Sequence, residues 1–255
     1  MKNNWKEFEL ILALRLYYQL PFGKMHKGNK DIIKLSKVIK RTPSSVAMKL
    51  SNFARLDTNL QKRQIKGLSN GSKSDEIVWN LYSNTNVLEK KSIEIIESLK
   101  NPELIKIFID EDTLNDACNI DIKEGITPKG RDKQSFFRKL ILSNFDNKCC
   151  ITGLSVMPLL VASHIIPWSK NEENRLNPKN GFLLNSIHDK AFDRGYITIN
   201  KDFKIVISEE IKRQEKTPFL IKTFLDYENR SIILPEKYLP AEEFIEYHNQ
   251  HIFKG

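Results

Sequence analysis

The residues best suited to chemistry lie in the C-terminal half, in the order His164, Asn180, His188, Asp189 and Asp193. An imidazole with an ordinary pKa of ~6.5 can accept a proton at neutral pH. An aspartate carboxylate is a hard oxygen donor of the kind that Mg²⁺ prefers. These residue types could therefore move a proton beside a divalent cation. By itself, however, a histidine in an apolar strand is more often a packed core residue.

Short elements of alternating type are expected to position these side chains. The segments are a strand-like run at 159–166, a turn at 177–181, a short strand at 182–184, a helix at 186–192 and a further strand at 196–200. The first contains His164, the turn contains Asn180, and Gly195 ends the helix. The predicted order is therefore strand, turn, strand and helix.

This order, with four linked sequence words, resembles the HNH nuclease family, which has the ββα-metal fold. The words are Cys-Ile-Thr-Gly from Cys150, Ala-Ser-His-Ile-x-Pro-Trp from Ala162, Arg-Leu-x-Pro-x-Asn-Gly from Arg175, and His-Asp-x-x-Phe-Asp-Arg-Gly from His188. Within the family they are most similar to the subgroup found in bacterial restriction endonucleases. The resemblance covers about residues 130–255.

The resemblance implies hydrolysis of DNA phosphodiesters with Mg²⁺, Mn²⁺ or another divalent ion, leaving 5′-phosphate and 3′-hydroxyl ends. It makes His164 the general base and gives Asn180 the role of tying the turn to the backbone near His164. His188 occupies the third motif position. One such site cuts one strand, so cleavage of double-stranded DNA would call for a homodimer or two binding events.

The metal ligands implied by the resemblance lie on the predicted helix. Asp189 lies nine residues after Asn180 and is expected first, with His188 next. Asp193 could be a second ligand, could orient Arg194, or could form only an ion pair at the helix end. The sequence departs from the commonest pattern at Ser163, where many members have an aspartate or histidine ligand, because a hydroxyl binds Mg²⁺ weakly.

Several other side chains near the motif have open roles. Arg175 and Arg194 could reach phosphate or could be structural. Cys149 and Cys150 lack a second cysteine pair, so no structural zinc is expected. The spacing of His248 and His251 is compatible with metal binding, but packing or surface roles are expected for both.

The positive charge of the chain lies at its N-terminus. The 255 residues have a net charge of +9, and residues 1–75 alone contain 16 Lys and Arg against 5 Asp and Glu, whereas residues 76–255 are nearly neutral. Such asymmetry suggests a module that binds a polyanion joined to a neutral one. A merely lysine-rich surface is the alternative.

Three short helices are predicted in this basic segment, at 5–20, 29–40 and from Pro43 after an N-cap at Thr42. The layout is that of a helix-turn-helix, whose second helix reads base edges, although a bundle used for packing or dimerisation has the same pattern. Ser44, Ser45, Lys49 and Asn52 are expected to be exposed. The full set of predicted DNA contacts in this half is Arg41, Ser44, Ser45, Lys49, Asn52, Lys62, Arg63 and Lys66.

The expected fold class is α+β. Residues 1–82 are predicted to form a basic helical DNA-binding domain, 83–128 a helical connector, and 129–255 the nuclease domain. Two helices are expected within 76–112, one near Trp79–Tyr82 and one spanning Leu88–Ile109, and residues 125–131 are expected to be the loop at the domain boundary.

The length of the apolar runs and the number of cysteines narrow the class of protein. No apolar run is long enough to span a membrane, and three cysteines cannot form a disulfide framework, so a reduced cytoplasm fits best. A restriction endonuclease is the most specific role expected, with dependence on a modified base left open. A DNA-binding regulator with a degenerate nuclease domain and a homing-type endonuclease remain alternatives.

Overall fold

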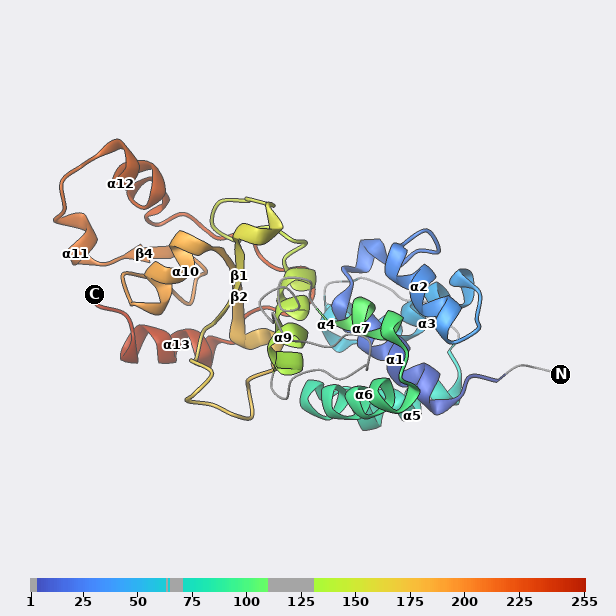
Figure 1. Cartoon of the computed structure of the whole chain (residues 1–255). Coiled ribbons are helices and arrows are strands. Elements are labelled where there is room, and N and C mark those ends of the chain that lie inside the picture. Colours follow the sequence, from blue (N-terminus) through green and yellow to red (C-terminus); the bar gives the residue numbers. More distant parts are fainter. Residues whose placement is uncertain (1–3, 63, 65–70, 110–130) are drawn as a thin grey trace. The chain divides into compact units, whose positions relative to one another are not determined.

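The computed structural model describes residues 4–62, 64, 71–109 and 131–255 (Figure 1). The chain folds into two compact units, Met1–Ser143 and Asn144–Gly255. The first unit is helical where it is described, and the second contains two small antiparallel sheets with helices, so the α+β expectation is confirmed. Within the described residues, no helix is long and apolar enough to cross a membrane.

The first unit is built around helix α1 (Glu7–Gln19), whose residues from Glu9 onward are all buried. Helix α1 contacts α2, α3, α5 and α6, which cover it from several sides. The helices of this unit are α2 (Lys30–Val38), α3 (Pro43–Leu56), α4 (Thr58–Lys62), α5 (Lys73–Tyr82), α6 (Thr85–Leu99), α7 (Pro102–Phe108) and α9 (Arg131–Asn144), with a 3₁₀ turn η1 (Phe22–Lys24).

The predicted N-terminal helices are confirmed. Helix α3 begins as expected, because the Thr42 side chain accepts a hydrogen bond from the Ser45 backbone N–H and Pro43 occupies the first turn. The single helix predicted from Leu88 to Ile109 is wrong. It is divided into α6 and α7 because Lys100 adopts a left-handed conformation and Asn101 starts a new helix just before Pro102.

The predicted connector is not a separate element of the structure. Helix α6 packs on α1 and helix α7 packs on α2, so both belong to the core of the first unit. The division between the compact units comes at Ser143 and Asn144, near the end of α9. The loop predicted at 125–131 lies almost entirely outside the described residues.

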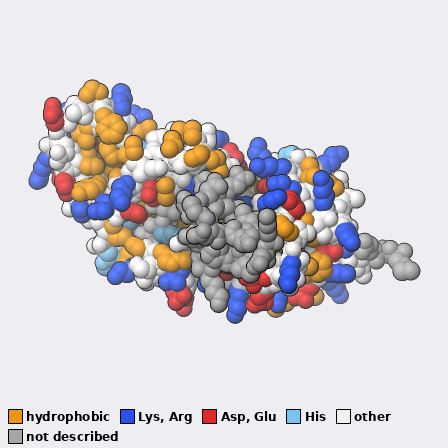
Figure 2. Space-filling view, viewed as in Figure 1, with side chains coloured by type: hydrophobic (Ala, Val, Ile, Leu, Met, Phe, Trp, Pro, Cys, Tyr) orange, Lys and Arg blue, Asp and Glu red, His pale blue; other side chains and the backbone are white. Residues whose placement is uncertain are grey.

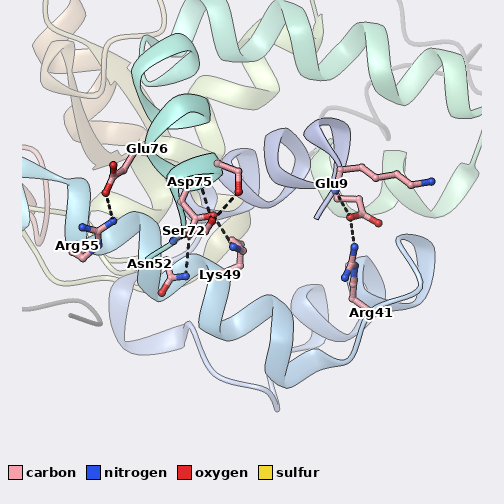
Figure 3. A network of polar contacts seen from close by, with 10 residues as sticks. Glu9, Arg41, Lys49, Asn52, Arg55, Ser72, Asp75 and Glu76 are labelled. Carbon is pink, nitrogen blue, oxygen red and sulfur yellow. Dashed lines mark hydrogen bonds and ion pairs between the residues drawn. The ribbon is translucent and has the colours of Figure 1, made fainter. Parts of the chain in front are cut away.

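A buried acidic side chain joins α5 to α3 (Figure 3). Asp75 is fully buried, accepts a hydrogen bond from Lys49 Nζ at 2.6 Å and another from Asn52 Nδ2 at 3.0 Å, and caps α5 through the Ser72 backbone N–H. Burial alone would raise the pKa of Asp75, but these donors outweigh it and lower the pKa. The expectation that Lys49 and Asn52 are exposed is therefore wrong.

The second unit places two β-hairpins around one short helix. Strands β1 (Leu160–His164) and β2 (Gly181–Asn185) pair antiparallel, and so do β3 (Ile197–Ile199) and β4 (Ile205–Ile207). Helix α10 (Ser186–Asp193) follows β2 directly and contacts β1, β2 and β3. The other elements are the 3₁₀ turns η3 (Met157–Leu159), η4 (Pro178–Asn180) and η5 (Leu225–Tyr227), and helices α11 (Glu209–Lys212), α12 (Pro218–Thr223) and α13 (Glu242–His251).

We expect Asp75→Ala to destabilise the first unit by about 3–5 kcal/mol, because it leaves the buried ammonium of Lys49 without a counter-charge. The free energy of unfolding would be measured by urea denaturation, followed by helical circular dichroism. Glu76→Ala is the matched control, since its ion pair with Arg55 is largely exposed and should contribute less than about 1 kcal/mol. Equal losses in the two variants would contradict this role of Asp75.

Candidate active site

The β1–β2 hairpin brings the predicted base next to the predicted turn. His164 is the last residue of β1 and pairs with Gly181, the first residue of β2, while Ser163 pairs with Phe182. Residues Gly181–Leu184 are all buried, which anchors β2 in the core of the second unit. The hairpin therefore fixes the backbone position of His164.

Asn180 ties the turn to the end of β1 through both atoms of its side-chain amide. Its Oδ1 accepts a hydrogen bond from the Ile166 backbone N–H at 2.8 Å, and its Nδ2 donates to the Ile166 carbonyl and to the Asn174 carbonyl. The side chain is 1% exposed, so these bonds are protected from water. This is the contact that the sequence predicted for Asn180.

A backbone carbonyl sets the tautomer of His164. The ring Nε2 lies 2.9 Å from the carbonyl oxygen of Arg175, and because a carbonyl can only accept, Nε2 carries the proton. The lone pair is then on Nδ1. Burial lowers the pKa of His164, and the bond to Arg175 only partly offsets this. The side chain is therefore a neutral imidazole at neutral pH, the form that can accept a proton.

Arg175 and Trp168 hold the loop around this histidine. Arg175 Nε donates to the Trp168 carbonyl at 2.9 Å, its Nη1 pairs with Glu172, and its guanidinium lies over the Trp168 ring. The Trp168 ring in turn meets His164 edge to face at 5.4 Å. The guanidinium predicted to reach phosphate is thus already engaged within the loop.

Helix α10 presents two carboxylates beside β1. The Ser163 side chain faces Asp189, and Asp193 lies close enough to act on it electrostatically. Burial, then repulsion from Asp193, raises the pKa of Asp189 to about 6, and burial also raises the pKa of Asp193. In the described residues neither carboxylate forms an ion pair, and Arg194 is exposed at the end of the helix.

Two unpaired, partly desolvated carboxylates fit a divalent cation. Repulsion from Asp193 contributes to the raised pKa of Asp189, and a cation between the two carboxylates would remove this cost. No group of three or more His, Cys, Asp or Glu side chains suitable for a metal was found among the described residues. Asp189 and Asp193 thus offer only part of a ligand set, which suits Mg²⁺ because this ion keeps several waters.

The structure corrects the role predicted for His188. Its Nδ1 accepts from Asn185 Nδ2 at 3.0 Å, and its Nε2 donates to the Thr223 carbonyl at 2.7 Å. The ring is 2% exposed and packs edge-on against Phe224 and Tyr227. Both ring nitrogens are occupied, so His188 has no lone pair for a metal or a proton and serves packing instead.

Helix α10 is held from its other side by α13. His248 stacks on Phe192 at 3.7 Å, its Nε2 donates to the Phe192 carbonyl, and its Nδ1 lies 2.8 Å from the Thr198 hydroxyl, which donates to Asn249 Oδ1. After α10, Gly195 has a φ of +75°, and a Cβ there would clash with the Ile252 carbonyl. The packing role expected for His248 is therefore observed.

Ser163 is the site residue whose role the sequence did not reveal. It was noted only as a departure from the usual ligand, whereas in the structure its side chain is buried near Asp189 and its hydroxyl has no hydrogen-bond partner among the described residues. Its position directly before His164 was the one available signal.

The DNA contacts predicted in the first unit have different environments. Ser44 and Lys62 are exposed and Ser45 is half-buried, but Arg41 pairs with Glu9 at 2.7 Å and is nearly buried, as Lys49 and Asn52 are. Because Arg41, Lys49 and Asn52 are nearly buried and bonded within the protein, they are not available to contact bases. The two remaining predicted residues, Arg63 and Lys66, lie outside the described residues.

A comparison with protein families identifies the segment that contains this geometry. Residues 149–200 match the family model for HNH endonucleases. The HNH segment includes Ser163, His164, Asn180, Asp189 and Asp193, and the match supports a nuclease function for the second unit. None of the curated proteins compared matches the chain.

We expect His248 to make the stability of the second unit depend on pH. Burial lowers the pKa of His248 from 6.5 to about 4, so the unfolded state binds a proton at a pH where the folded state does not. Acidification from about pH 7 to about pH 4.5 should therefore reduce the free energy of unfolding by roughly 1–3 kcal/mol through this residue.

Chemical denaturation across this pH range would test the effect in the wild type, His248→Gln and His251→Gln. The first variant should lose this part of the pH dependence. The second replaces an exposed histidine on the same helix and should keep it. A wild-type pH profile in His248→Gln would show that another group causes the dependence.

Proposed function

We propose that the chain is a DNA endonuclease that hydrolyses phosphodiester bonds with His164 as the general base. The observation that carries the proposal is the hydrogen bond from His164 Nε2 to the Arg175 carbonyl, which places the ring proton on Nε2 and the lone pair on Nδ1. The lowered pKa of His164 keeps the ring neutral. The match to HNH endonucleases names the substrate class that such a base would serve.

Asp189 and Asp193 would hold Mg²⁺, Mn²⁺ or another divalent ion. When bound, such an ion neutralises the charge that grows on the phosphate and on the leaving oxygen. Of the two carboxylates, Asp189 is the more shielded from solvent and faces Ser163, so we assign it the larger part. Repulsion between these carboxylates disfavours the empty site and favours the loaded one.

His164 accepts a proton from the attacking water through Nδ1. The water oxygen forms a bond to phosphorus as the bond to the 3′ oxygen breaks, and the leaving 3′ oxygen takes a proton from solvent water, which gives a 5′-phosphate and a 3′-hydroxyl. During this step the Arg175 carbonyl stabilises the imidazolium by accepting its Nε2–H. Asn180 keeps this base in place because it joins the turn to the backbone two residues beyond His164.

A restriction endonuclease is the role that we propose at the next level of detail. The basic helical unit would hold double-stranded DNA through its α2–turn–α3 region, which has the order of a helix-turn-helix. Two copies acting together would cut both strands. The proposal covers both an unmodified recognition site and one with a modified base, because DNA reading and cutting are assigned to separate compact units.

We expect His164→Ala to slow plasmid nicking by about 10²–10⁴-fold, since it removes the general base. Asp189→Asn should also lose most activity, and its loss should be partly relieved by a higher concentration of Mg²⁺ or Mn²⁺. The controls are His251→Ala and Asp202→Asn, which change exposed residues of the same types outside the site. Full activity of His164→Ala would overturn the mechanism.

Cleavage of the same plasmid with and without methylated bases, followed by sequencing of the ends, tests the finer role. A preference for one form supports a restriction system, whereas one long asymmetric target would indicate a homing-type enzyme. DNA binding without cleavage under all conditions would favour a regulator.

A further inference from the structure

A set of lysines surrounds helix α2 on the surface of the first unit. They recur every three or four residues, which places Lys30, Lys34 and Lys37 along one face of the helix. The set, called the α2 lysine face below, consists of Lys24, Lys27, Lys30, Lys34, Lys37 and Lys40. Five of these residues are exposed and Lys34 is half-buried. Figure 2 shows Lys and Arg side chains over this part of the unit.

The opposite side of α2 explains why these lysines face outward. Ile32 and Leu35 are fully buried, and the Asn29 side chain caps the helix by accepting hydrogen bonds from the backbone of Asp31 and Ile32. The apolar stripe packs α2 against α3 and α7. Packing therefore fixes the helix and leaves its charged stripe to solvent.

The charges of the α2 lysine face are not neutralised within the described part of the protein. None of its six lysines forms an ion pair or a side-chain hydrogen bond there. Glu103 of α7 lies near Lys34 and Lys37, but it pairs with Lys106 at 2.7 Å. The α2 lysine face therefore carries a concentrated positive charge that an anionic partner can neutralise.

Helix α3, the predicted reading helix, has the opposite property. Both of its cationic side chains are paired, Lys49 with buried Asp75 and Arg55 with Glu76. Trp5 also covers the Lys49 ammonium. The exposed side chains of α3 include Ser44 and Met48, which carry no charge. Of these two helices, α2 therefore carries the unpaired positive charge that can attract a polyanion, and α3 does not.

We propose that the α2 lysine face binds the phosphate backbone of double-stranded DNA and supplies the main salt-dependent affinity of the protein. The proposal rests on the proposed nuclease function, which makes DNA the polyanion that the chain meets. Lys30 and Lys37 lie about 10 Å apart along the helix, so both side chains can reach phosphates of one DNA strand. Contacts of this kind position the protein without reading sequence.

The test measures binding of the full chain to a DNA duplex, without divalent ions so that no cleavage occurs, over a range of salt concentrations. The triple variant Lys30→Gln, Lys34→Gln, Lys37→Gln should reduce the slope of log affinity against log salt by about 2.7, because each lost phosphate contact removes about 0.9. The loss should be similar for duplexes of unrelated sequence.

The matched control is Lys90→Gln, Lys91→Gln, Lys100→Gln, which removes the same charge from α6 and its C-terminal cap in the same unit. It should leave the slope nearly unchanged. An equal change in both triple variants would mean that only net charge matters, and an unchanged slope in the α2 variant would place the contacts elsewhere. Either result overturns the proposal.

A parallel nicking assay at low salt with Mg²⁺ separates this proposal from the nuclease function. If the wild type cleaves DNA but the α2 triple variant binds DNA with the wild-type salt slope, only the lysine-face proposal is overturned. Binding that depends on α2, together with no cleavage of any DNA, would overturn only the nuclease. A wild type that does not bind duplex DNA would contradict both.

Discussion

The amide of Asn180 is the contact on which the candidate site depends. It joins a turn to the backbone just beyond β1 with two buried hydrogen bonds to Ile166, and to the preceding loop with a third bond to the Asn174 carbonyl. Neither β1 nor β2 is longer than five residues, so the hairpin alone would be marginal. With this tie, the loop carrying Arg175 returns to His164, and the backbone carbonyl of Arg175 selects the tautomer of the base.

Helix α10 shows how one short element serves both packing and chemistry. His188 and Phe192 face the core, where the aromatic rings of η5 and the imidazole of His248 cover them. Asp189 and Asp193 lie on another face and form no ion pair within the described residues; burial raises both pKa values, although Lys190 nearby acts in the opposite direction. The packed inner face fixes the helix, and the outer face carries the two carboxylates that we propose as ligands of a divalent ion.

The first unit uses its charges in two different ways. Asp75 pairs with Lys49 of α3, and Glu9 pairs with Arg41 in the turn before α3. These buried ion pairs join secondary-structure elements. The lysines around α2 take no part in such pairs. A net charge counted from the sequence treats both groups alike, although only exposed, unpaired charges attract a polyanion over a distance.

The sequence by itself determined the order of elements in the second unit, the contact made by Asn180, and the starts of the N-terminal helices. These features follow from local rules: strand and turn composition, N-caps, and motif spacing. Residues 149–200 bear out the family expectation, and the Asn180 contact has the predicted form.

Only the tertiary structure decided which side chains are available. His188 looked like a ligand, and Lys49 and Asn52 looked like DNA contacts, because residue type and helical spacing do not show what packs on a face. Thr223 and Asp75, 35 and 26 residues away from His188 and Lys49, satisfy the polar atoms of these side chains. A buried polar group must find such a partner, and the partner comes from another element that local sequence patterns cannot place.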